Sequence, residues 1–173
     1  MDQEHPTRRL ILLRHAKSAW PDGVDDPDRP LADRGIADAT AAGVLLAGFG
    51  APDVVLCSPA LRTRQTWALV SQALTDPPPA RFEPVIYGAD VEELLELIRS
   101  VPADAGTVLL IGHEPTMSGT ATALAGPGSS AEDLIRLRTK YPTCAAAVFG
   151  VPPSWATVDA KSAVLEQFLV PRG

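Results

Sequence analysis

A chain of 173 residues with 46% hydrophobic residues is long enough to build one well-packed domain and short for two. Its formal net charge of -6 argues against nucleic acid or an anionic membrane as a partner, because both require a basic face. No apolar run approaches the ~18 residues of a membrane span, so we expect a soluble, cytoplasmic protein.

The chain starts with a polar stretch, predicted to be a tail over residues 1–8, and one domain is expected over residues 9–173. Short apolar runs predict buried strands over 9–13, 53–57 and 107–112, and the second of these runs is β-branched. The segment "RFEPVIY" predicts an edge strand over 81–87, because proline cannot donate to a ladder. The later apolar segments are typical of strands: 144–151, 154–158 and 163–170.

Helical spacing of apolar residues predicts helices over 31–49, 58–74 and 90–101, and one that starts near residue 113. Ser58 is the expected N-cap of the second helix, with Pro59 at its first helical position. Alternating strands and helices indicate an α/β fold, a single-domain three-layer αβα sandwich with a mainly parallel sheet. In such sheets ligands bind beyond the carboxyl ends of the strands.

Basic and imidazole side chains follow three of the predicted strands. Arg14 and His15 follow the first, Ser58 and Arg62 the second, and His113 the third. Each has an ordinary interpretation alone, as a packed histidine or a salt-bridged arginine. Together they place two arginines and two histidines at one sheet edge, without an acidic run in the same motifs. Since guanidinium forks and helix amides match phosphate oxygens, we expect a phosphate-binding pocket.

The motifs "LRHAKS", "SPALRTRQT" and "IGHEPT", in this order, resemble those of the histidine phosphatase superfamily, also called phosphoglycerate mutase-like. The short length and "YGADVEELLELIR" are most similar to the short bacterial protein-phosphohistidine phosphatases. The resemblance implies a phosphoglycerate mutase-like fold and a phosphatase that uses neither metal nor cofactor. It implies that His15 is the nucleophile, that Arg14 and Arg62 bind the phosphoryl oxygens, and that His113 stabilises the transition state.

A nucleophilic imidazole has to be neutral, and nearby positive charge favours the neutral form. We therefore expect Arg14, Arg62 and a cationic His113 to lower the pKa of His15. The other candidates for substrate contacts are Lys17, Ser58 and Glu114.

Two residues depart from the usual motifs of the resembled family. Ala16 stands where glycine is usual, which requires ordinary backbone angles there or local strain. Glu114 stands where asparagine is common; it could orient Arg14, transfer a proton or serve as a first-turn acid of the next helix. We favour a structural role for Glu114.

Family members that act on carbon–oxygen phosphoesters typically carry a glutamate acid between the second and third motifs. Glu92, Glu93 and Glu96 look like a solvated helix face, which leaves Glu83 as the remaining candidate, and we name no general acid. We therefore expect phosphohistidine in a protein as the substrate, since its nitrogen leaves with little proton assistance.

Two other functions stay open for the same pocket. One is a small-molecule phosphomonoesterase that uses Glu83 or Glu114 as its acid. The other is a phosphate or phosphoprotein binder without turnover, for which Ala16 and Glu114 would be the signs of decay. The sequence indicates no oligomeric state.

A cysteine phosphatase is disfavoured. Cys57 and Arg62 are one residue too close for the protein tyrosine phosphatase spacing, and Pro59 removes one of the amides that would bind phosphate. Cys57 and Cys144 both lie in apolar runs, so we expect buried free thiols.

Overall fold

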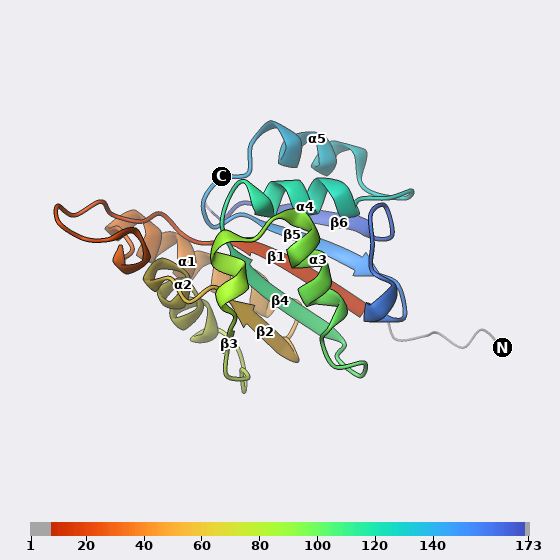
Figure 1. Cartoon of the computed structure of the whole chain (residues 1–173), viewed down its shortest axis with the longest axis horizontal. Helices are drawn as coiled ribbons and strands as arrows, with labels where there is room; N and C mark the ends of the chain where they lie inside the picture. The colour runs from red at the N-terminus through yellow and green to blue at the C-terminus, as the bar shows by residue number, and fades with distance from the viewer. Residues whose placement is uncertain (1–7, 172–173) are drawn as a thin grey trace.

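Six strands form one sheet in the order β3-β2-β4-β1-β5-β6 (Figure 1). The computed structural model describes residues 8–171. Neighbours from β3 to β1 run parallel, whereas β5 and β6 run antiparallel to their neighbours. The strands are β1 Arg8–Arg14, β2 Val54–Cys57, β3 Arg81–Phe82, β4 Thr107–Gly112, β5 Ala146–Val151 and β6 Val164–Leu169.

Helices cover both faces of this sheet, as Figure 1 shows. The α-helices are α1 Asp33–Ala47, α2 Leu61–Ser71, α3 Val91–Arg99, α4 Thr116–Leu124 and α5 Ala131–Thr139. Three short 3₁₀ helices are η1 Asp26–Asp28, η2 Pro84–Gly88 and η3 Trp155–Thr157. Within the described residues, no helix is long and apolar enough to cross a membrane.

Successive side chains along each strand point to opposite faces of the sheet, so a separate hydrophobic core forms on each face. Leu10 and Leu12 of β1 pack on the side of α3, α4 and α5, while Ile11 and Leu13 pack on the side of α1 and α2. The buried strands predicted over 9–13, 53–57 and 107–112 are therefore confirmed, as are the α/β class and the layered, mainly parallel architecture. The predicted tail lies outside the described residues except for Arg8, which already belongs to β1.

The predictions were wrong in three places. The edge strand over 81–87 stops at Phe82, since Pro84 begins η2 instead. Residues 154–158 contain the 3₁₀ helix η3, whose Trp155 is buried and donates from Nε1 to the carbonyl oxygen of Ala105 at 2.7 Å. Helix α5 was not predicted; few of its residues are apolar, and only Leu137 is buried.

One close contact fixes the loop that follows β1 against helix α1. A Cβ placed on Gly35 would lie 2.0 Å from the carbonyl oxygen of Lys17, so only glycine fits this approach. The same oxygen accepts a hydrogen bond from the amide of Ala32 at 2.9 Å. The backbone just beyond His15 is therefore held by the start of α1.

We predict that Gly35→Ala lowers the free energy of unfolding by about 1–3 kcal/mol, because the added methyl group forces the loop and the helix apart. Urea unfolding of wild type and variant measures the change. Gly88→Ala is the matched control, since its Cβ would meet nothing within 4 Å, and it should stay within about 0.5 kcal/mol of wild type. Equal stability of Gly35→Ala and wild type would contradict the contact.

Candidate active site

The carboxyl ends of β1, β2 and β4 bring the predicted residues to one place. The adjacent strands deliver His15 and His113 with their ring centroids 5.3 Å apart. A cavity of about 160 Å³ lies beside them. It is lined by Arg14, His15, Lys17, Ser18, Trp20, Arg29, Arg62, His113, Glu114 and Thr143.

His15 is buried, and its ring is oriented by its own chain. Nδ1 lies 2.7 Å from the carbonyl oxygen of Ala16. A carbonyl only accepts, so Nδ1 carries the proton and Nε2 keeps a free lone pair. Burial lowers the pKa of His15 to about 3, and the nearby His113, Arg62 and Arg14 add to the effect. The imidazole is thus neutral and directs one lone pair away from its anchor.

The pKa of His15 moves in the direction that the sequence predicted, but burial is the main cause. The prediction of a cationic His113 was wrong for the unliganded site. Burial and Arg62 lower the pKa of His113 to about 4, so its ring is also neutral near pH 7.

Hydrogen bonds on both sides fix the tautomer of His113. Its Nδ1 lies 3.4 Å from Nη2 of Arg62, which can only donate, so Nδ1 accepts. Its Nε2 then donates to Oγ of Ser58 at 2.7 Å. Nδ1 of His113 therefore carries no proton and faces Arg62.

Ser58 was expected to cap helix α2 and to contact substrate. Its side chain is fully buried and does not line the cavity, so it positions His113 rather than touching substrate. Helix α2 begins at Leu61 with Ala60 as N-cap, and the hydroxyl of Ser58 accepts from the amide of Ala60 at 3.4 Å as well as from His113. The hydroxyl of Thr63 donates instead to the carbonyls of Ser58 and Ala60, at 2.7 Å each.

Arg62 is held by an acidic residue that the sequence did not single out. Asp26, in η1, accepts from Nη1 of Arg62 with its carbonyl oxygen at 2.8 Å and from Nη2 with its carboxylate at 3.1 Å. Its carboxylate also pairs with Arg29 at 3.2 Å and accepts from the hydroxyl of Tyr87. The hydrogen bond from Tyr87 and the interaction with Arg62 hold the pKa of Asp26 below its usual range, against the opposing effect of burial.

The guanidinium of Arg14 has fewer hydrogen-bond partners than that of Arg62. Its Nη1 donates to the carbonyl of Tyr141 at 2.8 Å, which leaves Nη2 without a partner among the described residues. The Nε atoms of Arg14, Arg29 and Arg62 are also buried without hydrogen-bond partners in this part of the chain. Buried donors of this kind require a partner, and all three arginines line the same cavity.

Glu114 lines the cavity, but one carboxylate oxygen, Oε1, accepts from the amide of Ser118 in the first turn of α4 at 2.6 Å. This is a helix-capping contact, in keeping with the structural role favoured above. Lys17 also lines the cavity, and its side chain is exposed. Glu83 does not line it and pairs with Arg81 at 3.7 Å.

The backbone around His15 is tied down from two sides. Ala16 has no left-handed φ, so alanine causes no strain there, and its amide donates to Oγ1 of Thr66 at 3.0 Å. The amide of Cys144 donates to the carbonyls of Arg14 and His15 at 3.1 and 3.0 Å. Cys144 itself has φ 65°, a left-handed conformation unusual for a residue with a side chain.

The thiols are free and buried, as expected. Burial raises the pKa of Cys57 to about 12, so this group is not a thiolate near pH 7 and does not support a cysteine phosphatase. Among residues 8–171, no cluster of three or more His, Cys, Asp or Glu side chains is placed to hold a metal ion.

Sequence reasoning missed Asp26, Trp20, Arg29, Tyr87 and Thr143. The first three lie in the polar loop after β1, where composition predicts only an irregular connection. The sequence signal available was Trp20 itself, an aromatic residue in a polar loop. Its side chain is 73% exposed in the structure.

Comparisons with known proteins agree on one family. The sequence profile of the histidine phosphatase superfamily (branch 1) matches residues 10–86. An uncharacterized protein of Mycobacterium tuberculosis, Rv1276c, is 45% identical over 162 residues, which cover 92% of this chain and 100% of that protein.

Two solved structures share the fold and are described as SixA proteins. The "putative phosphohistidine phosphatase SixA" from Nakamurella multipartitia is 36% identical, with a TM-score of 0.84 over 96% of this chain and 98% of that one. The protein histidine phosphatase SixA in complex with tungstate is 23% identical, with a TM-score of 0.77 over 95% and 97% of the two chains. The second supports the fold alone.

We predict that the ring signals of His15 and His113 stay constant between about pH 8 and about pH 5, because the two pKa values are about 3 and about 4. In the unfolded chain both should titrate near the ordinary value of ~6.5. NMR of histidine-labelled protein, with and without urea, measures both.

The same shifts predict how stability depends on pH. Below about pH 6.5 the unfolded state binds more protons than the folded state, so the free energy of unfolding decreases as the pH falls toward 4. Titration of either ring near 6.5 in the folded protein would contradict this description of the site.

Proposed function

The chain belongs to the histidine phosphatase superfamily and has its phosphoglycerate mutase-like fold, and from this premise we propose that it hydrolyses phosphohistidine in proteins, with His15 as nucleophile. The observation that carries the proposal is the hydrogen bond of His15 Nδ1 to the carbonyl of Ala16. It leaves the Nε2 lone pair free beside a small cavity lined by three arginines.

In the first step, Nε2 of His15 attacks the phosphorus of the substrate. A P–N bond to His15 forms while the P–N bond of the substrate phosphohistidine breaks. The leaving nitrogen keeps the electron pair and takes a proton from solvent. The positive charge that develops on the His15 ring is stabilised by the Nδ1–H bond to Ala16.

In the second step, water attacks the phosphorus, a P–O bond forms and the P–Nε2 bond breaks. One proton of the water passes to Nδ1 of His113, which carries no proton, as Arg62 turns from this nitrogen to the phosphoryl oxygens. Inorganic phosphate then leaves, and His113 returns the proton to solvent. His113 thus becomes cationic only while the phosphoryl group is in place, where its charge stabilises the developing anion.

The arginines supply the charge compensation. The unpartnered Nη2 of Arg14 is available to phosphoryl oxygens, and Arg29 and Arg62 line the same cavity. A phosphoryl group would also compete with Asp26 for the fork of Arg62. These fixed cations offer at the phosphoryl oxygens what a metal ion offers in metal-dependent phosphatases.

The acids near the cavity favour a leaving group that needs little protonation. Asp26 is ionised by its partners, and one oxygen of Glu114 accepts from the Ser118 amide. An alkoxide calls for a positioned proton donor, whereas the nitrogen of phosphohistidine is a far weaker base as it leaves.

Trp20 offers a surface for that leaving group. It lines the cavity and is 73% exposed, and the guanidinium of Arg29 lies 3.3 Å from its ring centroid. A flat aromatic side chain at the rim suits the planar imidazole of a substrate phosphohistidine.

We predict that His15 becomes phosphorylated during turnover and that His15→Ala lowers activity by at least about 10³-fold without unfolding the protein. Rapid quench with radiolabelled substrate should trap an acid-labile, alkali-stable adduct. His113→Ala should still form it, but should hydrolyse it more slowly. Circular dichroism checks the fold of both variants.

Activity should also survive a chelator, because the arginines provide the positive charge. An acid-stable adduct, no adduct, or strict dependence on added magnesium or zinc would overturn this mechanism.

We predict a higher kcat/KM on a phosphohistidine peptide than on alkyl phosphates. Trp20→Ala should raise KM for the phosphohistidine peptide by about 3- to 10-fold, because stacking is lost, and leave KM for an alkyl phosphate within about 2-fold. Val24→Ala, in the same loop but away from the cavity lining, is the matched control. Side-by-side steady-state kinetics measure all three proteins.

A preference for an alkyl phosphate, lost in Glu114→Gln, would instead identify a small-molecule phosphomonoesterase with Glu114 as its acid. Tight phosphate binding without turnover of any substrate would identify a phosphate-binding module.

A further inference from the structure

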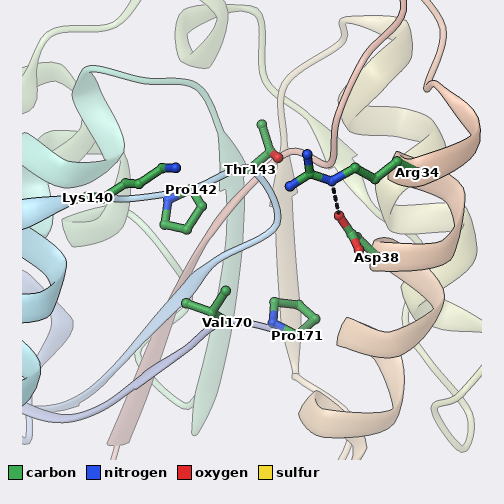
Figure 2. Close-up of a pocket in the computed structure, with 7 residues that line it drawn as sticks. All are labelled: Arg34, Asp38, Lys140, Pro142, Thr143, Val170 and Pro171. Carbon is green, nitrogen blue, oxygen red and sulfur yellow. Dashed lines mark ion pairs between the residues drawn. The ribbon is translucent and has the colours of Figure 1, made fainter. Parts of the chain in front are cut away.

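The catalytic cavity opens into a longer groove. A neighbouring cavity of about 220 Å³ is lined by Arg14, Lys17, Arg34, Lys140, Pro142 and Thr143. A third, of about 420 Å³, is lined by Arg34, Asp38, Lys140, Pro142, Thr143, Val170 and Pro171 (Figure 2). Thr143 lines all three cavities, so they adjoin one another. We call the second and third cavities together the basic groove.

Cations outnumber carboxylates in the basic groove. Its lining holds Arg14, Lys17, Arg34 and Lys140 against one carboxylate, that of Asp38. Asp38 pairs with Arg34 at 3.6 Å. Lys17 and Lys140 form no ion pair with any residue that the structure describes. The protein as a whole carries a net charge of -6, so the groove departs locally from the overall negative charge.

The two outer cations face each other across the third cavity. Figure 2 shows Arg34 extending from α1 and Lys140 from the segment after α5, with their charged ends directed toward the space between them. The side chain of Arg34 is 71% exposed in spite of its ion pair with Asp38. Two cations pointing into one space suit an anionic group between them.

Three apolar residues also line the third cavity. Val170 and Pro171 lie below the two cations in Figure 2, and Pro142 lies next to Lys140. This mixture of apolar wall and opposed cations fits a peptide with carboxylate side chains better than a free ion, which would leave the apolar surface unused.

The geometry points to a second binding site for the substrate of the proposed function: we propose that the basic groove binds an acidic segment next to the phosphohistidine of a phosphoprotein. The phosphoryl group occupies the cavity beside His15 and His113, and the flanking chain runs past Thr143. One or two Asp or Glu side chains then reach Lys17, Lys140 and Arg34.

Size separates this ligand from a small diphosphorylated molecule. The third cavity, at about 420 Å³, is the largest of the three and lies beyond the 220 Å³ cavity from the catalytic histidines. A peptide spans such a path with several residues, since each extended residue covers about 3.3 Å.

The test measures hydrolysis of two phosphohistidine peptides by wild type and by the charge-reversal variant Lys140→Glu. The peptides are identical except that one carries Glu and the other Gln at the positions that flank the phosphohistidine. Wild type should hydrolyse the Glu peptide with about 3- to 10-fold higher kcat/KM, mainly through KM, and salt should weaken the preference. Lys140→Glu should abolish or invert it. Arg138→Glu makes the same charge change two residues away, outside the groove lining, and should keep the preference.

Inorganic phosphoramidate, which lacks a flanking chain, reports the catalytic cavity alone, and its hydrolysis should be unchanged in Lys140→Glu. Lys140→Gln, a milder change, should show an intermediate preference, and melting temperatures check that both variants fold.

The possible failures are distinguishable. Hydrolysis of both peptides without preference, or a preference kept in Lys140→Glu, overturns the basic groove as a peptide site and leaves the proposed function standing. No hydrolysis of either peptide overturns the proposed function and this inference with it. An equally large effect of Lys140→Glu on a small diol carrying two phosphates would reassign the groove to small molecules.

Discussion

The bond from Nδ1 of His15 to the carbonyl oxygen of Ala16 sets what the whole site can do. It fixes the tautomer, and burial keeps the ring neutral, so one lone pair is both available and aimed. That bond is only as fixed as the backbone that carries it. On one side the amide of Ala16 donates to Oγ1 of Thr66. On the other side the amide of Cys144, a residue with a left-handed backbone conformation just before β5, donates to the carbonyls of Arg14 and His15.

Crowded guanidinium groups repel one another, and Asp26 offsets the repulsion while no anion is bound. It holds Arg62 beside His113 and links it to Arg29 and Tyr87. The cations are therefore already in position before substrate arrives, which reduces the reorganisation that binding requires. Asp26 lies in the loop after β1, and its carboxylate contacts Arg29, Arg62 and Tyr87, which are far apart in the chain. One carboxylate therefore partly neutralises two arginines from different elements.

Sequence alone predicted the parts of the molecule that depend on local pattern. Buried strands end directly on His15 and His113, and sheet topology then requires the two to meet. The sequence could not predict the pairing of Asp26 with Arg62. An acidic residue in a polar loop is most simply read as solvated, and only the path of the loop in the structure shows that it reaches Arg62. Ser58 shows the same limit: its position suited a helix cap, but the sequence could not show that its hydroxyl also accepts from Nε2 of His113.

Both thiols of the chain are sealed in the core that faces α1 and α2, and burial raises the pKa of Cys57 and of Cys144 to about 12. Peroxide attacks thiolates, and neither group supplies one at neutral pH. A phosphatase whose nucleophile is an imidazole nitrogen has no sulfenic acid to form at its centre. The proposed reaction would therefore continue through an oxidative burst that silences phosphatases built on an active-site cysteine.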